Sequence, residues 1–573
     1  MLLMVDAARR IGPRPLAFYA LHRLSHAAGL PQRRLRAAPC SWPAGDLLPT
    51  TLPPPPLLTP GDMARLRAAL AALPPVRWHG SFDATAPAIG MDLFHPGDVR
   101  PVWEANRLGW VPLLVQAARL WPEEGHREAL AARLREWSLA NPAFRGPNWA
   151  CGQEAALRVL HLALALVLAG NAGHPPDAIR HLLRRHARRI AATRAYARAQ
   201  DNNHAISEPA GLLACGWLLG ERRMARGAAR DLSAALARLV APDGGFAQLS
   251  TGYHRLLLDT LSVVELLRQA LRQPPLPSPF ATRAMAAARW LARLVADDGG
   301  LPRLGHQDGS ALADLSCCGE ADARGSAERA LRLFAGESAG FGAEPGCLWL
   351  GLPAAPAMPR PAAWRASGSM GWESAGARAL LRAGPLRFRP GQADLLHFEL
   401  WDGSRPILAD GGTGAYNPAA AERWWLDYFP AAAAHNTITF DGREPMPRLS
   451  RFLLARWPRL WAVAGGAALR DMHGNGHRRA IRAEGRVWTV EDEVSGRFHR
   501  LELRWRLGPG AWRLEPDGAS GAARLRLEAD APFLLALEQG WESPAYGVVR
   551  PCSVLVARIA APVRQLRTTV MLP

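Results

Sequence analysis

The chain has 573 residues, too many for one ordinary domain, so we expect two or three domains that each bury a core. A hydrophobic content of 49% with 21% charged residues excludes a largely disordered chain. The net charge of +19 comes entirely from arginine, whose planar fork suits carboxylate and sulfate groups. Because the arginines are spread evenly and form no recognisable module, we expect no nucleic-acid binding.

Residues 1–58 form an Arg- and Pro-rich segment, which we predict to be irregular and to pack on the surface. Its apolar opening is short, is interrupted by Asp6 and is followed by no small-residue cleavage site, so it does not resemble a signal peptide. The most apolar internal run, 162–168, is far too short to span a bilayer. We therefore expect no transmembrane segment.

Residues 59–350 carry apolar residues at helical spacing, beginning with Thr59 as an N-cap, Pro60 at the first helical position and Asp62 in the first turn. Many helices of similar length follow, and short polar loops join them. Because there is no strict sequence period, the pattern favours an α/α toroid of helical hairpins, complete or incomplete, over a regular solenoid.

The pattern changes after residues 351–364, a Pro-rich stretch that we interpret as a linker. In residues 365–573 the apolar period becomes two, as in the alternating series Leu501, Leu503, Trp505 and Leu507. This part predicts an antiparallel β-sandwich, so the whole chain is expected to be an α+β multidomain protein.

The seven cysteines are scattered, odd in number and without a C-x-x-C pair. This spacing indicates neither a disulfide framework nor a zinc ribbon. We expect mostly buried or inert thiols.

Three helix starts carry more polar residues than packing requires. The first, in residues 141–158, contains Trp149, Gln153 and Glu154; taken alone, it is best explained as a capped helix with a buried tryptophan.

The second helix start is the stretch DNNHAISEPAG, which contains Asn202, Asn203, His204 and Glu208. His204 and Glu208 are four residues apart and share a face on a helix. The pattern is equally consistent with capping asparagines and a structural His–Glu pair. Pro209 must either start the regular helix or kink it.

The third helix start, in residues 244–259, places Tyr253, His254 and Arg255 after a Gly-rich turn. A tyrosine in such a place is more often a core residue with a hydrogen-bonded hydroxyl.

One chemistry needs a tyrosine, a histidine and a neutral amide together: β-elimination of a uronic-acid polysaccharide. The amide donates hydrogen bonds to the carboxylate beside C5 and stabilises the enolate-like intermediate. A tyrosine or histidine removes the C5 proton, and one of them protonates the leaving O4. A tyrosine base needs a lowered pKa, which Arg255 or a charged histidine would provide.

Taken together, these stretches resemble the heparinase II/III-like polysaccharide lyases, whose fold is an α/α toroid followed by an antiparallel β-sandwich. The matching segments cover most of the chain in the family's order and comprise residues 98–121, 148–158, 201–213, 244–259, 393–418 and 433–445. The resemblance implies a lyase of acidic, uronate-containing polysaccharides in the periplasm or cell envelope; because no clear signal peptide is present, a cytoplasmic location is the alternative.

By this resemblance, Asn203 would neutralise the substrate carboxylate, Tyr253 would be the general base or acid, and His204 its partner. The substrate-binding residues that we expect are Trp149, Gln153, Asn202, Glu208, His254, Arg255, Gln392, Tyr416 and His435.

The chain departs from the family in one motif. Family members usually carry His-x-His-Ala-Asp at the start of the sandwich segment, where this chain has Pro390-Gly391-Gln392-Ala393-Asp394. Asp410 and His435 match two metal-ligand positions of the family, but Gln392 is a poor zinc ligand. We therefore expect no zinc or other cofactor, and instead a hydrogen-bonded cluster of Gln392, Asp410 and His435. His397 would point to the opposite face from Asp394 if the strand alternated there.

Two other functions remain open. A non-catalytic polysaccharide-binding or assembly protein would keep the fold and lose the chemistry, which the missing histidines favour. A glycoside hydrolase on the same scaffold would need two facing carboxylates, for which Glu154 and Glu208 are the available pair.

Overall fold

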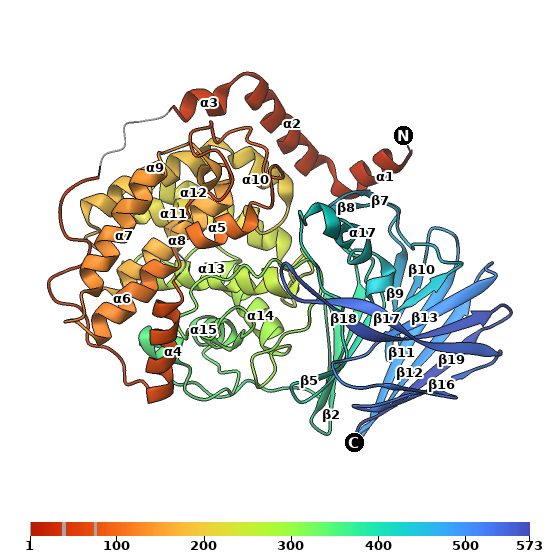
Figure 1. The fold of residues 1–573 in the computed structure, drawn as a ribbon. Helices are drawn as coiled ribbons and strands as arrows, with labels where there is room; N and C mark the ends of the chain where they lie inside the picture. Colours follow the sequence, from red (N-terminus) through yellow and green to blue (C-terminus); the bar gives the residue numbers. More distant parts are fainter. Residues whose placement is uncertain (1, 37–41, 74–76) are drawn as a thin grey trace.

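The computed structural model describes all residues except 1, 37–41 and 74–76, and it has a helical lobe and a sheet lobe side by side (Figure 1). Within the described residues, no helix is both long and apolar enough to cross a bilayer. The fold predicted from the sequence, a helical N-terminal region followed by antiparallel sheets, is confirmed.

The N-terminal segment is helical, so the prediction of an irregular segment was wrong for its first part. It forms α1 (Leu2–Ile11), α2 (Pro13–Ala27) and α3 (Leu30–Arg34). Prolines lie at the first positions of α2 and α3, where a missing backbone N–H costs nothing. We call α1–α3 the N-terminal arm; it runs across the top of the molecule from the helical lobe to the sheet lobe (Figure 1).

The helical lobe begins as predicted, because Thr59 and Asp62 form a reciprocal capping box with Pro60 in the first turn. Its helices are α4 (Pro60–Ala71), α5 (Arg100–Asn106), α6 (Trp110–Leu120), α7 (His126–Ala140), α8 (Gly152–Leu168), α9 (Asp177–Ala192), α10 (Arg194–Gln200), α11 (His204–Leu218), α12 (Arg222–Leu239), α13 (Thr251–Ala270), α14 (Phe280–Ala292), α15 (Arg324–Phe334) and α16 (Pro345–Trp349), with a 3₁₀ turn η1 (Pro147–Trp149).

Three nearly completely buried helices, α8, α11 and α13, pack against one another at the centre of this lobe. The more amphipathic α6, α9, α12, α14 and α15 pack around them as hairpin partners. Because the N-termini of all three inner helices follow the polar stretches of the sequence, this layering brings those stretches together.

The named strand pairs of the sheet lobe are antiparallel, and they include both hairpins and pairs of strands far apart in the sequence. A five-stranded sheet has the order β1 (Ala363–Ala366), β2 (Gly368–Ser374), β3 (Ala377–Gly384), β4 (Phe398–Asp402), β5 (Arg405–Leu408). An eight-stranded sheet has the order β14 (Arg513–Glu515), β15 (Gly518–Ser520), β16 (Arg524–Ala529), β19 (Gln565–Met571), β12 (Val487–Ser495), β11 (Gly476–Glu484), β10 (Gly466–Arg470), β9 (Arg459–Val463).

A four-stranded sheet has the order β17 (Phe533–Ala545), β18 (Val548–Ala560), β13 (Arg500–Arg506), β6 (Ile438–Phe440), and β7 (Arg448–Ser450) pairs with β8 (Leu453–Leu454). Short helical turns are η2 (Ala420–Glu422), α17 (Trp425–Tyr428) and η3 (Ala432–Ala434). The alternating series at 501–507 lies in and just after β13, with Leu501, Leu503 and Trp505 buried in the core between the sheets.

The two lobes share an apolar contact and several polar ones. Trp290 and Leu294 of the helical lobe pack with Leu380 of the sheet lobe in one small core. Arg303 pairs with Glu542 across the interface at 2.9 Å. These contacts fix the sheet lobe against the open ends of the inner helices, where the candidate site lies.

Candidate active site

A cavity of about 560 Å³ lies between the two lobes. Eight of the sequence-predicted site residues line it: Gln153, Asn202, Asn203, His204, Glu208, Tyr253, Gln392 and Tyr416. They come from the starts of α8, α11 and α13 and from the loops of the sheet lobe. The volume falls in the range of ordinary small-molecule sites.

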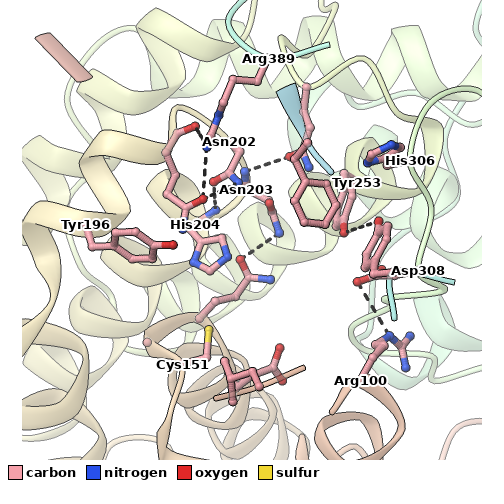
Figure 2. Close-up of a pocket in the computed structure, with 18 of the residues that line it drawn as sticks. Arg100, Cys151, Tyr196, Asn202, Asn203, His204, Tyr253, His306, Asp308 and Arg389 are labelled. Atoms are coloured by element: carbon pink, nitrogen blue, oxygen red, sulfur yellow. Dashed lines mark hydrogen bonds and ion pairs between the residues drawn. The ribbon is translucent and has the colours of Figure 1, made fainter. Parts of the chain in front are cut away.

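The start of α11 presents two asparagines in different ways. The Asn202 side-chain oxygen accepts the backbone N–H of His204 at 3.0 Å and so caps the helix. The Asn203 side chain makes no capping bond; its amide donates to the Gln153 side-chain oxygen at 2.8 Å (Figure 2). Asn203 is therefore a buried, fixed amide rather than a cap, and Pro209 lies inside a helix that already begins at His204.

His204 and Glu208 form the predicted pair on one face of α11. The His204 Nδ1 lies 3.1 Å from the Glu208 Oε1. Because a carboxylate only accepts, Nδ1 donates in this bond, so the lone pair of the neutral imidazole is on Nε2. Glu208 is buried beside Gly152 at the start of α8, so the carboxylate holds the imidazole in one tautomer and one orientation.

Tyr253 lies in the first turn of α13, which Ser250 caps. Its hydroxyl is 3.0 Å from the hydroxyl of Tyr416 of the sheet lobe (Figure 2). Burial, and then the negative charge of Asp308, raise the pKa of Tyr253 well above its usual 10. The expectation that Arg255 lowers this pKa was wrong, because the Arg255 guanidinium points away to Ser326 and the Glu320 carbonyl.

Sequence reasoning missed an acidic and basic network on one wall of the cavity. Asp308 lines it and lies 3.8 Å from Arg100, while Arg107 binds Glu154 through two bonds of 2.7 and 2.8 Å. Because both oxygens of Glu154 are engaged by Arg107, Glu154 is not free to act as a hydrolase acid or base. The signal for Asp308 was the polar run His306-Gln307-Asp308 between α14 and α15.

Two further polar residues of the cavity were also missed. Arg389 donates to the carbonyl and side chain of Gln200, and among the described residues no carboxylate forms an ion pair with it. His306 donates from Nε2 to the Gly391 carbonyl at 3.0 Å, and burial lowers the pKa of His306 to about 4. Arg389 directly precedes Pro390, the position at which the sequence indicated only the loss of a family histidine.

Three predicted substrate-binding residues lie outside the cavity lining. Trp149 is buried and donates to the Asn141 carbonyl. His254 stacks on Trp290 and bonds the Ala287 carbonyl. Arg255 is buried and donates to Ser326 and to the Glu320 carbonyl. His254 and Arg255 are turned inward by the helical period of α13, and Trp149 is buried in the turn η1, which the residue types alone did not reveal.

His435 also lies outside the cavity lining, in a buried cluster with Asp410 and His397. The prediction that Gln392 belongs to a cluster with Asp410 and His435 was wrong, because the Gln392 amide donates to the Gly412 carbonyl instead. The alternation argument against His397 failed because residues 394–397 form a turn and β4 begins only at Phe398.

The hydrogen bonds of this cluster do not fit a zinc ion. The Nδ1 of His397 accepts the backbone N–H of Asn436 at 2.8 Å, so its proton resides on Nε2, the nitrogen that faces Asp410 at 3.4 Å. A neutral histidine would need a lone pair on that nitrogen to bind a metal. His435 and Asp410 are 2.7 Å apart, which is a charged hydrogen bond.

Comparisons with known proteins agree with this architecture. Residues 357–564 match the family model described as Heparinase II/III-like, C-terminal. The fold is similar to a heparinase III structure (TM-score 0.65, 15% identity, 97% of this chain and 91% of that one). It is also similar to heparan sulfate lyase HepC from Pedobacter heparinus (TM-score 0.54, 16% identity, 97% and 88%). No curated protein matches the chain in sequence.

Proposed function

We propose that this chain, whose residues 357–564 form a heparinase II/III-like C-terminal domain, is a polysaccharide lyase that cleaves a uronic-acid-containing chain by β-elimination. One observation carries the proposal: an amide pair, a carboxylate-held histidine and a tyrosine pair line a single cavity. This set contains the carboxylate-binding donor, the base and the acid that the reaction needs.

The amide pair would bind the substrate carboxylate. One hydrogen of the Asn203 amide is used by Gln153, while within the described structure the amide nitrogen of Gln153, a residue that lines the cavity, has no hydrogen-bond partner. Two amides with free N–H groups, fixed and buried, can donate to the carboxylate as its charge grows in the enolate-like state. Their rigidity means that no reorganisation is needed when the C5 proton leaves.

The proton transfers follow from the protonation states. The Nε2 lone pair of His204 takes the C5 proton, the C5–H electrons form the C4–C5 double bond, and the C4–O4 bond breaks. Tyr253, whose raised pKa keeps it a neutral phenol, gives its proton to O4. The Tyr416 hydroxyl then donates to the Tyr253 phenolate and stabilises it. The histidine is thus the base and the tyrosine the acid.

The test is ultraviolet absorbance of the C4–C5 double bond when the full chain is incubated with heparan sulfate, hyaluronan, alginate and bacterial exopolysaccharides. A rising signal with one of them, absent in Asn203→Ala and Tyr253→Phe proteins that fold normally, supports the lyase. Wild-type turnover in either variant would refute the role assigned to that residue.

A binding protein that lacks the chemistry is the second candidate. The observation in its favour is that residues 385–396 of the sheet lobe bring no imidazole to the cavity, where the family resemblance implies two histidines in place of Pro390 and Gln392. Tight binding of one polysaccharide without any absorbance change would select this function over the lyase.

A further inference from the structure

Two segments bridge the lobes beside the cavity, and the first is the N-terminal arm, which runs from the helical lobe to the sheet lobe (Figure 1). On the sheet lobe, the Asp6 carboxylate accepts the Arg456 backbone N–H at 2.7 Å, and the Arg10 guanidinium lies 4.9 Å from the Trp457 ring. On the helical lobe, Arg14 lies 3.6 Å from Asp201. The arm is therefore tied to both lobes, and its partner Asp201 lines the cavity.

The inner side of α2 forms part of the cavity itself. His22 and His26 line it, and the His22 ring is 4.8 Å from the ring of Tyr196 at the end of the cavity where Asn202 and Arg389 also lie (Figure 2). A sugar chain that left the site past Tyr196 would meet these imidazoles.

The second bridge is the loop at residues 89–98, before α5. Its Phe94 carbonyl accepts the Asn417 amide at 2.7 Å, and Arg451 lies 4.5 Å over the Phe94 ring. Its Asp98 accepts the Tyr546 hydroxyl at 2.6 Å. Three contacts from this one loop thus reach three different segments of the sheet lobe.

Both bridges meet the same part of the sheet lobe, the β7–β8 hairpin and the turn after it, residues 448–457. Phe452 of this hairpin lines the cavity between His306 and Tyr416, at ring distances of 5.5 and 5.2 Å. The arm, the 89–98 loop and the hairpin therefore all contribute side chains to the lining of the cavity.

A polysaccharide cut in its middle needs an open path on both sides of the reacting bond. Here segments that bridge the lobes contribute to the cavity lining, and the cavity volume of about 560 Å³ is that of a site for a short saccharide. We propose that the enzyme acts exolytically: it takes the end of an acidic polysaccharide, or a short oligosaccharide, and releases a small unsaturated product. This inference rests on the proposed lyase function.

The test follows viscosity, absorbance and product size together, with hyaluronan and alginate as substrates. Exolytic action gives unsaturated mono- or disaccharides from the first time point, while viscosity stays nearly constant as the double-bond signal rises. An early fall in viscosity with long unsaturated products overturns the proposal. Absence of any double-bond signal bears instead on the proposed function, so the two failures are distinguishable.

The bridges can be opened one at a time. Arg10→Ala combined with Arg14→Ala loosens the arm, and Arg451→Ala loosens the 89–98 loop; Arg9→Ala, an exposed arginine on α1 for which the structure records no ion pair, is the matched control. We expect several-fold more viscosity loss per double bond in the opened variants and no change in the control. Unchanged product sizes in both opened variants would overturn the role given to the bridges.

Discussion

The Glu208 carboxylate lies directly against Gly152: a Cβ added at Gly152 would be 2.7 Å from the Glu208 Oε2. The absence of a side chain at the start of α8 is therefore what lets Glu208 reach the position from which it holds His204. The packing of Gly152 against Glu208 therefore sets the position of His204, the proposed base.

Gly152→Ala should displace the Glu208 carboxylate and tilt the His204 ring. We expect activity to fall by about 10- to 100-fold, because small misplacements of a reacting group have effects of that size, while the protein stays folded with a loss of about 1–3 kcal/mol. Steady-state kinetics and urea unfolding measure both.

The control is Gly227→Ala in α12, where an added Cβ meets nothing within 4 Å. It should leave activity unchanged and stabilise the helix by up to ~1 kcal/mol. If Gly152→Ala were as harmless as Gly227→Ala, the His204–Glu208 geometry would not matter for turnover.

Tyr253→Phe removes the proposed acid and should lower kcat by about 10²- to 10⁴-fold. Because burial and Asp308 raise the pKa of Tyr253 above 10, the acid stays protonated through neutral and mildly alkaline pH. The wild-type rate should therefore show no loss due to Tyr253 between pH 7 and 9.5. A kcat/KM profile that declined in this interval and lost the decline in Tyr253→Phe would contradict it, and the exposed Tyr19→Phe serves as control.

The sequence was sufficient for the fold and for some of the site residues at the helix starts, but not for Trp149, His254 and Arg255, which lie outside the cavity lining. Helical spacing, the Thr59 capping box and the two-residue period in β13 are local signals, so they could be recognised without coordinates. Asn203, His204 and Tyr253 share a cavity because their helices are neighbours, which the family resemblance implied.

What the sequence could not provide is the direction of each side chain and the contacts between distant segments. His254 and Arg255 follow Tyr253 directly, yet the helix turns them into the core. Asp308 and Arg389 reach the cavity from loops whose course depends on the packing of the two lobes. No local pattern encodes such long-range placement.

Arg389→Ala should weaken substrate binding. Its guanidinium lines the cavity and has no carboxylate partner among the residues described, so it is available to an anionic sugar. A charged hydrogen bond of this kind corresponds to about a 10- to 100-fold rise in KM with little change in kcat. Arg387→Ala, whose side chain donates to the Arg238 carbonyl outside the cavity lining, is the control; equal effects of the two would mean general charge attraction only.

Zinc should not stabilise the protein. The His397 nitrogen that faces Asp410 carries a proton, since its other nitrogen accepts the Asn436 N–H. We expect elemental analysis of the purified chain to find less than stoichiometric metal and the melting temperature to be the same with added zinc and with a chelator. A chelator-sensitive melting temperature would show that these hydrogen bonds rearrange around an ion.

The Asp410–His435 pair should instead make stability depend on pH. Burial alone would lower the pKa of His435, but Asp410 raises it above 6.5; burial would raise the pKa of Asp410, but His435 and His397 bring it to about 2. The His435 contribution is complete below pH 6.5 and is lost as pH rises through its raised pKa. The Asp410 contribution, about 2 kcal/mol, is complete above pH 4 and is lost as pH falls toward 2.

His435→Gln should therefore lower the free energy of unfolding most between about pH 4 and 6.5. The difference in free energy of unfolding between the variant and the wild type should shrink as pH rises beyond 7. Urea unfolding at pH 5, 6, 7, 8 and 9 measures that difference directly. The exposed His473→Gln variant corrects for the general effect of removing an imidazole. A difference that stayed constant across this range would mean that His435 remains neutral in the folded protein and contributes through packing and neutral hydrogen bonding alone.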